Sequence, residues 1–330
     1  MRPFRSPAMI AGLVAFAVLV WISSAPAQAQ DYPTRPIRLV VAFAAGGTTD
    51  FVARLAANKL KTLLGQSVIV ENKPGANGAI AAESVAKADP DGYTLFFSTA
   101  GALSINPAMR ADLPYAPLRD FAPVGMVARN TVLLAINSTL KIETAQEFIA
   151  LAKEKPGAIT VAITGVGAIS HLAIELLQAS AGIKLLYVPY RGAAGALTDL
   201  ISGQLNAMSA EVPVLLPLIN SGKARIIGVS AQARSNALPD VPTFSELGYP
   251  DVIADNWSGI MAPARTPPAV IARLNNAINA AVSDLDVRRK LTESGVSPLS
   301  GTPGDLADLI QSETARWSKV VKERGIHGER

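Results

Sequence analysis

The feature that most constrains the fold is an alternation of short apolar runs, rich in β-branched residues, with longer stretches of helical periodicity. Strands that alternate with helices predict βαβ units around largely parallel sheets. The expected strands are residues 37–43, 67–70, 94–97, 159–163, 184–188, 204–208, 224–229 and 257–262. The expected helices are residues 49–64, 78–87, 145–153, 170–179, 194–201, 214–220, 268–291 and 304–322. We therefore predict an α/β fold in which each domain holds a mainly parallel sheet flanked by helices.

One segment breaks this alternation. Residues 121–136 form a long, mostly apolar run with no helix inside it, which indicates a crossing between two domains, and residues 224–230 are a candidate for the return. A chain of 330 residues fits two domains, because a domain typically has roughly 150 residues. We expect a discontinuous domain 1 at residues 30–126 with 228–330 and an inserted domain 2 at residues 127–227. Hinge motion is expected at the crossing segments near residues 127–131 and 224–228.

The N-terminus has the pattern of a secretory signal peptide. Arg2 and Arg5 precede an apolar run at residues 8–22, and the small residues at 27–29 offer a cleavage site. The alternative is a membrane anchor, but the apolar run is shorter than the roughly 20 residues that a spanning helix needs. We predict a signal peptide at residues 1–29 and a mature chain exported to the periplasm.

Composition excludes several kinds of site. The chain has no cysteine, which rules out disulfides, thiolate metal ligands and cysteine nucleophiles, and its two histidines, His171 and His327, make a histidine-based metal site improbable. Its small positive charge is scattered, and only 5% of its residues are aromatic, which argues against nucleic-acid binding. We expect no metal, no cofactor and no nucleic-acid partner.

A pair of glycines, Gly46 and Gly47, separates the first strand from the first helix of the mature chain. Glycine backbone N–H groups and the positive end of a helix together favour a carboxylate or a phosphate. The junction lacks the Gly-Lys-Ser/Thr ending of a P-loop. A tight turn, with Thr48 or Thr49 as the helix N-cap and Asp50 complementing the helix dipole, explains the same residues equally well.

A second glycine-rich junction, residues 165–170, is a near miss to the dinucleotide-binding fingerprint because it ends in Ser170. The following strand carries no acidic residue at its end, which argues against NAD. Ser170 is expected to be a helix N-cap whose hydroxyl caps the helix, faces a ligand, or does both. His171 comes next and opens the alternative of an exported hydrolase that uses Ser170 and His171. Against it, the chain has no Gly-x-Ser-x-Gly elbow, and adjacent residues of a first helical turn point in different directions.

Further polar junctions lie at residues 75–78 and 98–101. Ligands of open parallel sheets bind beyond the carboxyl ends of the strands, so the junctions either converge on one crevice or serve only as turns. Glu211 follows the expected strand 204–208 and precedes a helix begun at Pro213. Its carboxylate either faces the ligand, where it favours an amino or hydroxyl donor, or complements the positive end of the next helix.

Several motifs in one order, spread over nearly the whole mature chain, resemble the Bug family, the extracytoplasmic solute receptors of tripartite tricarboxylate transporters. The motifs are residues 32–41, 43, 46–50, 70–76, 170–172, 188–192, 238–243 and 262–267. The resemblance implies a two-domain periplasmic binding protein of type II with a ligand cleft between the domains. It also implies that the chain is not an enzyme, and that it captures a small organic acid or acidic amino acid for membrane transporter subunits or for a sensor domain. We expect a monomer.

The resemblance also implies where the ligand binds, with the carboxylate held by backbone N–H groups and ordered water rather than by an arginine. The implied ligand residues are Ala45, Gly47, Thr48, Thr49 and Asp50 in the first loop, Gly165, Gly167, Ile169, Ser170 and His171 in the second, and Asn77, Ser98 and Thr99 as walls. Glu211 is our addition from its place in the sequence. Two positions depart from the family: Ala44-Ala45 stand where a proline is common, and Glu211 stands where Asp is frequent.

Overall fold

The computed structural model describes residues 32–190 and 192–326. The predicted signal peptide at residues 1–29, Arg191 and His327 therefore lie outside the described residues. Residues from Arg35 onward group into one compact unit, of which residues 32–34 are not part. No helix of the described residues has the length and apolarity that a membrane crossing requires.

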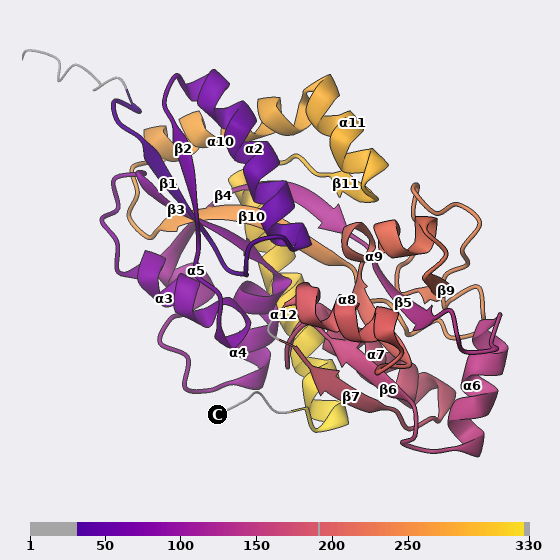
Figure 1. Ribbon diagram of the computed structural model, residues 1–330. Helices are drawn as coiled ribbons and strands as arrows, with labels where there is room; N and C mark the ends of the chain where they lie inside the picture. The colour runs from indigo at the N-terminus through magenta and orange to yellow at the C-terminus, as the bar shows by residue number, and fades with distance from the viewer. Residues whose placement is uncertain (1–31, 191, 327–330) are drawn as a thin grey trace, which may run out of the picture. The chain divides into compact units, whose positions relative to one another are not determined.

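Strands and helices alternate along this unit much as the sequence predicts (Figure 1). The strands are β1 (Ile37–Val41), β2 (Val68–Asn72), β3 (Thr94–Thr99), β4 (Phe121–Asn130), β5 (Val132–Asn137), β6 (Thr160–Ile163), β7 (Leu186–Pro189), β8 (Ala207–Glu211), β9 (Ala224–Val229), β10 (Asn256–Pro263) and β11 (Val296–Pro298). The helices are α2 (Thr48–Leu64), η1 (Ala76–Gly78), α3 (Ala79–Ala86), η2 (Gly101–Ile105), α4 (Asn106–Met109), α5 (Pro117–Asp120), α6 (Ala145–Glu154), α7 (Ile169–Ala181), α8 (Ala193–Ser202), α9 (Val212–Asn220), α10 (Pro268–Ser283), α11 (Leu285–Glu293) and α12 (Pro303–Arg324).

The strands form two sheets, and in each of them most strands run in the same direction. The first sheet has the order β11-β4-β10-β3-β1-β2, and the second has the order β7-β6-β8-β5-β9. Strands joined by a helical crossover are parallel, namely β1 with β2 and β6 with β7, and β1–β3 and β6–β8 also pair in parallel. The strand β10 pairs antiparallel with both β3 and β4, and β5 pairs antiparallel with both β8 and β9. The strand β11 pairs antiparallel with β4. The predicted α/β class, with two mainly parallel sheets flanked by helices, is confirmed.

The apolar run at residues 121–136 is a direct passage between the sheets. It forms β4 of the first sheet and β5 of the second, with Thr131 alone between them. The whole of β9 pairs within the second sheet, so the return to the first sheet occurs in residues 230–255. Domain boundaries after residues 126 and 227 stay a prediction. The chain passes between the two sheets at Thr131 and within residues 230–255, so these segments are the candidate hinges.

One predicted helix is divided. The segment expected as a single helix at residues 268–291 forms α10 and α11, because Asp284 takes an extended conformation between them. The Asp284 carboxylate accepts hydrogen bonds from the N–H groups of Asp286 and Val287, and so starts α11 as a side-chain N-cap.

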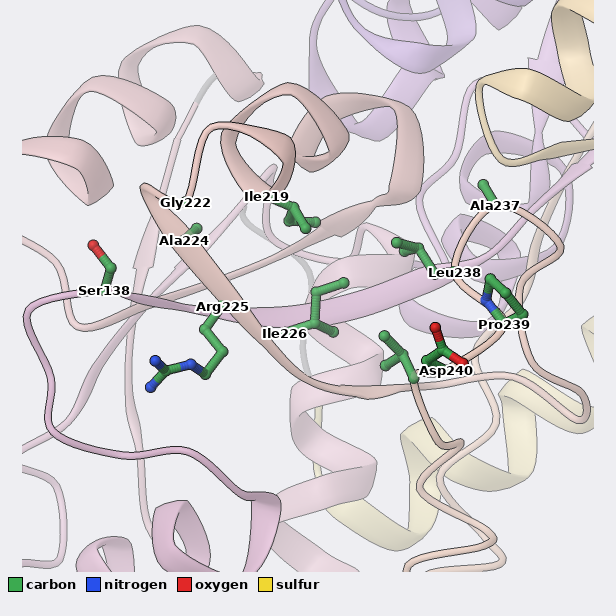
Figure 2. A pocket seen from close by; sticks show the side chains of 11 residues that line it. Ser138, Ile219, Gly222, Ala224, Arg225, Ile226, Ala237, Leu238, Pro239 and Asp240 are labelled. Atoms are coloured by element: carbon green, nitrogen blue, oxygen red, sulfur yellow. The ribbon is translucent and has the colours of Figure 1, made fainter.

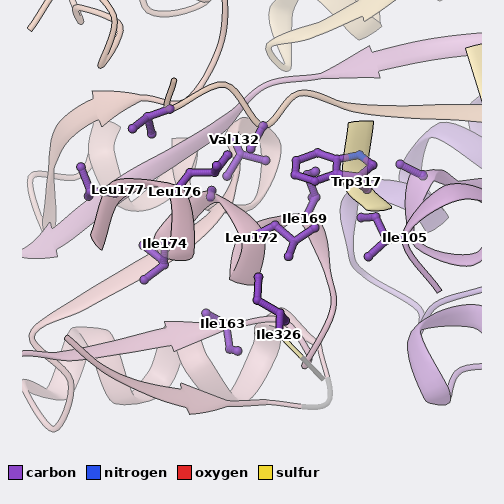
Figure 3. Packing of buried hydrophobic residues seen from close by; sticks show 14 of the residues in the cluster. Ile105, Val132, Ile163, Ile169, Leu172, Ile174, Leu176, Leu177, Trp317 and Ile326 are labelled. Carbon is purple, nitrogen blue, oxygen red and sulfur yellow. The ribbon is translucent and has the colours of Figure 1, made fainter. Parts of the chain in front are cut away.

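The strand β5 of the second sheet is buried on both faces, which explains its continuous apolar run. Along β5, Val132 and Leu134 face one core cluster, and Leu133 and Ala135 face the other. Figure 3 shows part of the first cluster, in which Trp317 of α12 and the apolar face of α7 meet. This cluster also contains residues of β1 and β3, so one apolar core extends under both sheets and supports the loops that follow their strands.

Candidate functional site

The first predicted loop is shaped by Asp50. The Asp50 side chain is 7% exposed, and its carboxylate accepts hydrogen bonds from Gly46 N (3.0 Å), Arg54 Nε (2.9 Å) and Asn72 Nδ2 (2.9 Å). Burial raises the pKa of Asp50, but Arg54, the Gly46 N–H and Asn72 outweigh this and hold the pKa below its ordinary value. Asp50 is therefore an ionised residue whose carboxylate holds the loop in place.

The start of α2 leaves its first N–H groups without a side-chain cap. The N-cap is Gly47, so the prediction of Thr48 or Thr49 as N-cap is wrong. Both threonines are buried in the first turn, and Ala45 and Gly46 are exposed in front of it. Backbone N–H groups at such a helix start have no partner inside the helix and suit an anion.

The second predicted loop joins β6 to α7 and is held by uncharged contacts. Ala168 is the N-cap and offers no side-chain cap, so the prediction of Ser170 as N-cap is wrong. Ser170 lies in the first turn instead, where its Oγ accepts a hydrogen bond from Thr164 N (3.1 Å) and lies 2.9 Å from Thr164 Oγ1. Gly165 and Gly167 both have positive φ, which glycine adopts without strain.

The His171 side chain stabilises the second predicted loop through contacts of its ring. Its Nδ1 accepts a hydrogen bond from Gly167 N at 3.2 Å, its Nε2 lies 3.4 Å from Glu175 Oε1, and its ring packs edge-on against Tyr187. No hydrogen bond joins Ser170 to His171 in the part of the chain that the structure describes. The geometry thus gives Ser170 and His171 separate structural contacts rather than those of a nucleophile and its base.

Asn77 links the junction after β2 to the second predicted loop. Its Nδ2 donates to the Gly167 carbonyl at 2.8 Å and to Asn106 Oδ1 at 3.2 Å. Asn106 in turn donates to the carbonyls of Ala76 and Asn77. Asn77 follows a strand of the first sheet, and Gly167 follows a strand of the second. This bond therefore brings together junctions that are 90 residues apart in the chain.

The other predicted wall residues, Ser98 and Thr99, are completely or almost completely buried at the end of β3. Ser98 Oγ lies 3.4 Å from the Thr99 carbonyl, and Thr99 Oγ1 accepts from Gly101 N. A Cβ at Gly101 would lie 2.6 Å from Asn77 Oδ1, so a larger residue here would displace the Asn77 side chain. The start of η2, which follows β3, thus lies close to the Asn77 side chain.

Glu211 is the last residue of β8, which extends beyond the predicted strand 204–208. Glu211 is also the N-cap of α9, yet its side chain caps nothing there and accepts a hydrogen bond from Asn256 Nδ2 at 2.5 Å. The Thr48 and Asn130 side chains face the same carboxyl group. Burial raises the pKa of Glu211, and these three neighbours offset only part of the increase.

Sequence reasoning missed Asn106, Asn130 and Asn256. Each is a buried amide within or beside an apolar segment, and that mismatch was the available signal. Periodicity does not reveal that Asn130 and Asn256 are paired across β4 and β10, because this pairing depends on the direction of the crossing strands.

A separate hollow lies on the second sheet. It has a volume of about 440 Å³ and is lined by Arg225 and Ile226 of β9, Ile219 of α9 and the loop at residues 237–241 (Figure 2). None of the predicted ligand residues lines this hollow. Among the described residues, no three His, Asp or Glu side chains form a group that is able to hold a metal ion.

The chain matches a known protein family over most of its length. Residues 52–326 match the family described as the tripartite tricarboxylate transporter family receptor. The chain is similar to the protein BugT of Bordetella pertussis, with 38% identity over 92% of this chain and 93% of that protein. The matched family consists of solute-binding receptors rather than enzymes.

Two solved structures are similar throughout. An R. palustris protein solved with adipate is 35% identical, with a TM-score of 0.86 over 90% of this chain and 99% of that chain. The protein MatC from Rhodopseudomonas palustris, solved with bound malate, is 35% identical, with a TM-score of 0.82 over 88% of this chain and all of that chain.

Proposed function

The chain belongs to the family of tripartite tricarboxylate transporter receptors, and on this premise we propose that it captures a small carboxylate between its two glycine-containing loops. The family membership confirms the resemblance to the Bug receptors. The hydrolase alternative is set aside, since the family is one of receptors and Ser170 and His171 have other partners.

The observation that carries the proposal is the hydrogen bond from Asn77 to the Gly167 carbonyl. It draws together the loop before α7 and the junction after β2, at the carboxyl ends of strands from different sheets. Ligands of α/β sheets collect at such strand ends. The uncapped starts of α2 and α7 supply N–H groups for an anion there.

The two loops contain no arginine or lysine, so the proposed recognition uses backbone N–H groups of Gly47, Thr48, Ile169 and Ser170. A carboxylate accepts several such bonds at once. The two similar structures were solved with adipate and with bound malate, which supports the carboxylate class.

We propose that the chain acts in the periplasm after removal of residues 1–29, and that it delivers its ligand to membrane transporter subunits or to a sensor domain as a monomer. Closure over the ligand is proposed to bend the chain at Thr131 and within residues 230–255, where it passes between the sheets. Saturating ligand is then expected to reduce the radius of gyration measured by small-angle scattering.

A thermal-shift screen of mono-, di- and tricarboxylates and acidic amino acids tests the proposal. A ligand that binds only the folded state at a hundred times its Kd stabilises that state by about 2.7 kcal/mol. The protein is first unfolded and refolded, so that no ligand retained from the cell hides the shift. A shift with sugars or cations but with no carboxylate would overturn the carboxylate assignment.

A further inference from the structure

The polar groups around Glu211 have more hydrogen-bonding capacity than their neighbours satisfy. Asn130 is completely buried and Thr48 is 4% exposed, and both face the Glu211 carboxyl group. Thr48 Oγ1 and both amide atoms of Asn130 complete no hydrogen bond within the described residues. The Glu211 carboxyl group itself has one good partner, Asn256 Nδ2.

Such groups are costly to leave unpaired. A buried donor or acceptor without a partner destabilises the folded state by about 1–3 kcal/mol. Three such atoms around one carboxyl group therefore indicate a site that a polar molecule completes.

This group of residues is continuous with the proposed carboxylate loop. Thr48 is the first residue of α2, directly after the N-cap Gly47. Glu211 ends β8 in the second sheet, whereas Asn130 and Asn256 lie in paired strands of the first sheet. A molecule held at the start of α2 thus lies beside residues of both sheets.

The charges around Glu211 determine which chemical group of a ligand binds beside it. No lysine, arginine or histidine forms an ion pair with Glu211 in the described part of the chain, so a carboxylate ligand group beside it gains no cation. A hydroxyl or ammonium group instead donates a hydrogen bond to the Glu211 carboxylate, and an ammonium group also supplies the missing positive charge.

We propose that Glu211, Asn130 and Thr48 form a second subsite that takes a hydrogen-bond donor of the ligand, so that the receptor selects a hydroxy or amino acid over the plain dicarboxylate of equal length. This inference rests on the proposed function, because the ligand's own carboxylate occupies the start of α2. The raised pKa of Glu211 agrees with it, since a donor on the ligand stabilises the ionised form that burial disfavours.

Isothermal titration of refolded protein with matched acids tests the subsite. The probes are succinate, malate and aspartate, which share four carbons and differ in one hydrogen, hydroxyl or ammonium group, with glutarate and glutamate, and adipate and 2-aminoadipate, as longer pairs. We expect at least tenfold tighter binding of the donor-bearing acid in one chain-length set. Binding of every plain diacid within about threefold of its donor-bearing partners would overturn the subsite and leave the proposed function standing. Binding of no carboxylate would overturn both.

The variant Glu211→Gln separates recognition from structure. Its amide oxygen still accepts a bond from a hydroxyl group, but the variant carries no negative charge. We expect the preference for the amino acid over the plain diacid to fall below about threefold, with a smaller change for the hydroxy acid and none in the matched control Glu143→Gln, whose side chain is 78% exposed. An equal loss for all the acids would mean that Glu211 only ties Asn256 in place, and would overturn the inference.

Proton linkage in the wild-type protein gives a readout that does not depend on the variant. Titrations in two buffers of different ionisation enthalpy count the protons taken up on binding. We expect more protons to be taken up with the plain diacid than with the amino acid, because the ammonium group keeps Glu211 ionised. Equal uptake with both acids from pH 5.5 to 8 would contradict the subsite.

Discussion

Two carboxyl groups near the start of α2 have opposite surroundings. Asp50 accepts bonds from a backbone N–H, an arginine and an asparagine, and its pKa lies below the ordinary value. Glu211 has a single good donor, Asn256, and its pKa lies above the ordinary value. Burial raises the pKa of both groups, but Arg54, the Gly46 N–H and Asn72 outweigh it at Asp50, whereas the uncharged neighbours of Glu211 do not.

The comparison distinguishes a group that shapes the site from a group that is available to a ligand. The hydrogen bonds of Asp50 fix the backbone of the first loop and leave it little capacity for another donor. Glu211 has spare capacity and faces unpaired polar atoms. We therefore interpret Asp50 as a structural residue of the first loop and Glu211 as a candidate ligand contact.

The largest expected effect follows from removal of Asp50. Asp50→Ala leaves the Gly46 N–H, Arg54 and Asn72 without their acceptor, and we expect the free energy of unfolding at pH 7 to fall by about 3 kcal/mol. Carboxylate affinity is expected to fall with it, because the first loop loses its shape. Urea unfolding and thermal shift measure the two effects.

The contribution of Asp50 to the free energy of unfolding is expected to depend on pH. Since folding lowers the pKa of Asp50, its stabilisation is present above the unfolded pKa of about 4 and is lost as the pH falls below it. The gap between wild type and Asp50→Ala is expected to narrow below about pH 4. A gap that is small at pH 7, or that does not change with pH, would contradict the role given to Asp50.

Asp255 is a third carboxyl group with which the comparison of Asp50 and Glu211 is tested. Its Oδ1 is buried without a hydrogen bond, its other oxygen is 3.9 Å from Arg129 Nη1, and burial raises its pKa to about 6. Because the folded pKa exceeds the unfolded value of 3.8, ionisation of Asp255 destabilises the folded state as the pH rises from about 4 to 6. Asp255→Asn is expected to be more stable than wild type by about 2 kcal/mol at pH 7 and equal to it below about pH 4. Parallel stability curves over that range would show that Asp255 has adequate partners.

Glycine substitutions compare the two loops directly. Their expected effects on the free energy of unfolding are smaller than those of the carboxyl-group variants. A Cβ at Gly167 would lie 2.9 Å from Met109 Sδ at a φ of +75°, whereas a Cβ at Gly47 meets no atom closer than 3.9 Å at an ordinary φ of −88°. Gly65, at a φ of +71° with no atom within 4 Å, provides the control for backbone strain alone.

We expect Gly65→Ala to cost about 1 kcal/mol of unfolding free energy and Gly167→Ala about 1 kcal/mol more, because Asn77 and His171 hold Gly167 in place. Gly47→Ala is expected to stay within about 0.5 kcal/mol of wild type. Denaturant unfolding of the three variants measures these differences. Equal costs at Gly65 and Gly167 would show that Met109 moves aside freely.

Much of the fold was predictable because periodicity and turn residues act locally. The strand at residues 224–229 and the helices at residues 49–64 and 145–153 agree with the structure to within a residue. Strand pairing was less predictable, since the crossing run at residues 121–136 does not reveal that β4 pairs antiparallel with β10 and that β5 pairs antiparallel with β8.

The candidate site was predictable in its loops but not in its contacts. The glycine-rich junctions predict that Gly47 and Gly167 lie in loops between a strand and a helix, and both do lie just before a helix. Nothing local in the sequence reveals that Asn77 reaches Gly167, or that Asn256 reaches Glu211 across 45 residues. Ser170 was misassigned as an N-cap because Ser is a common capping residue, whereas Thr164 engages its hydroxyl.

The central claim is that one carboxylate is bound by both loops. Titration of a carboxylate that gives a thermal shift into isotopically labelled protein, followed by amide NMR, tests it most directly. The account predicts that the N–H signals of Gly47 and Thr48 and those of Ile169 and Ser170 shift together along one binding curve, with Gly65 unchanged. Shifts confined to one loop, or centred on the hollow beside Arg225, would contradict it.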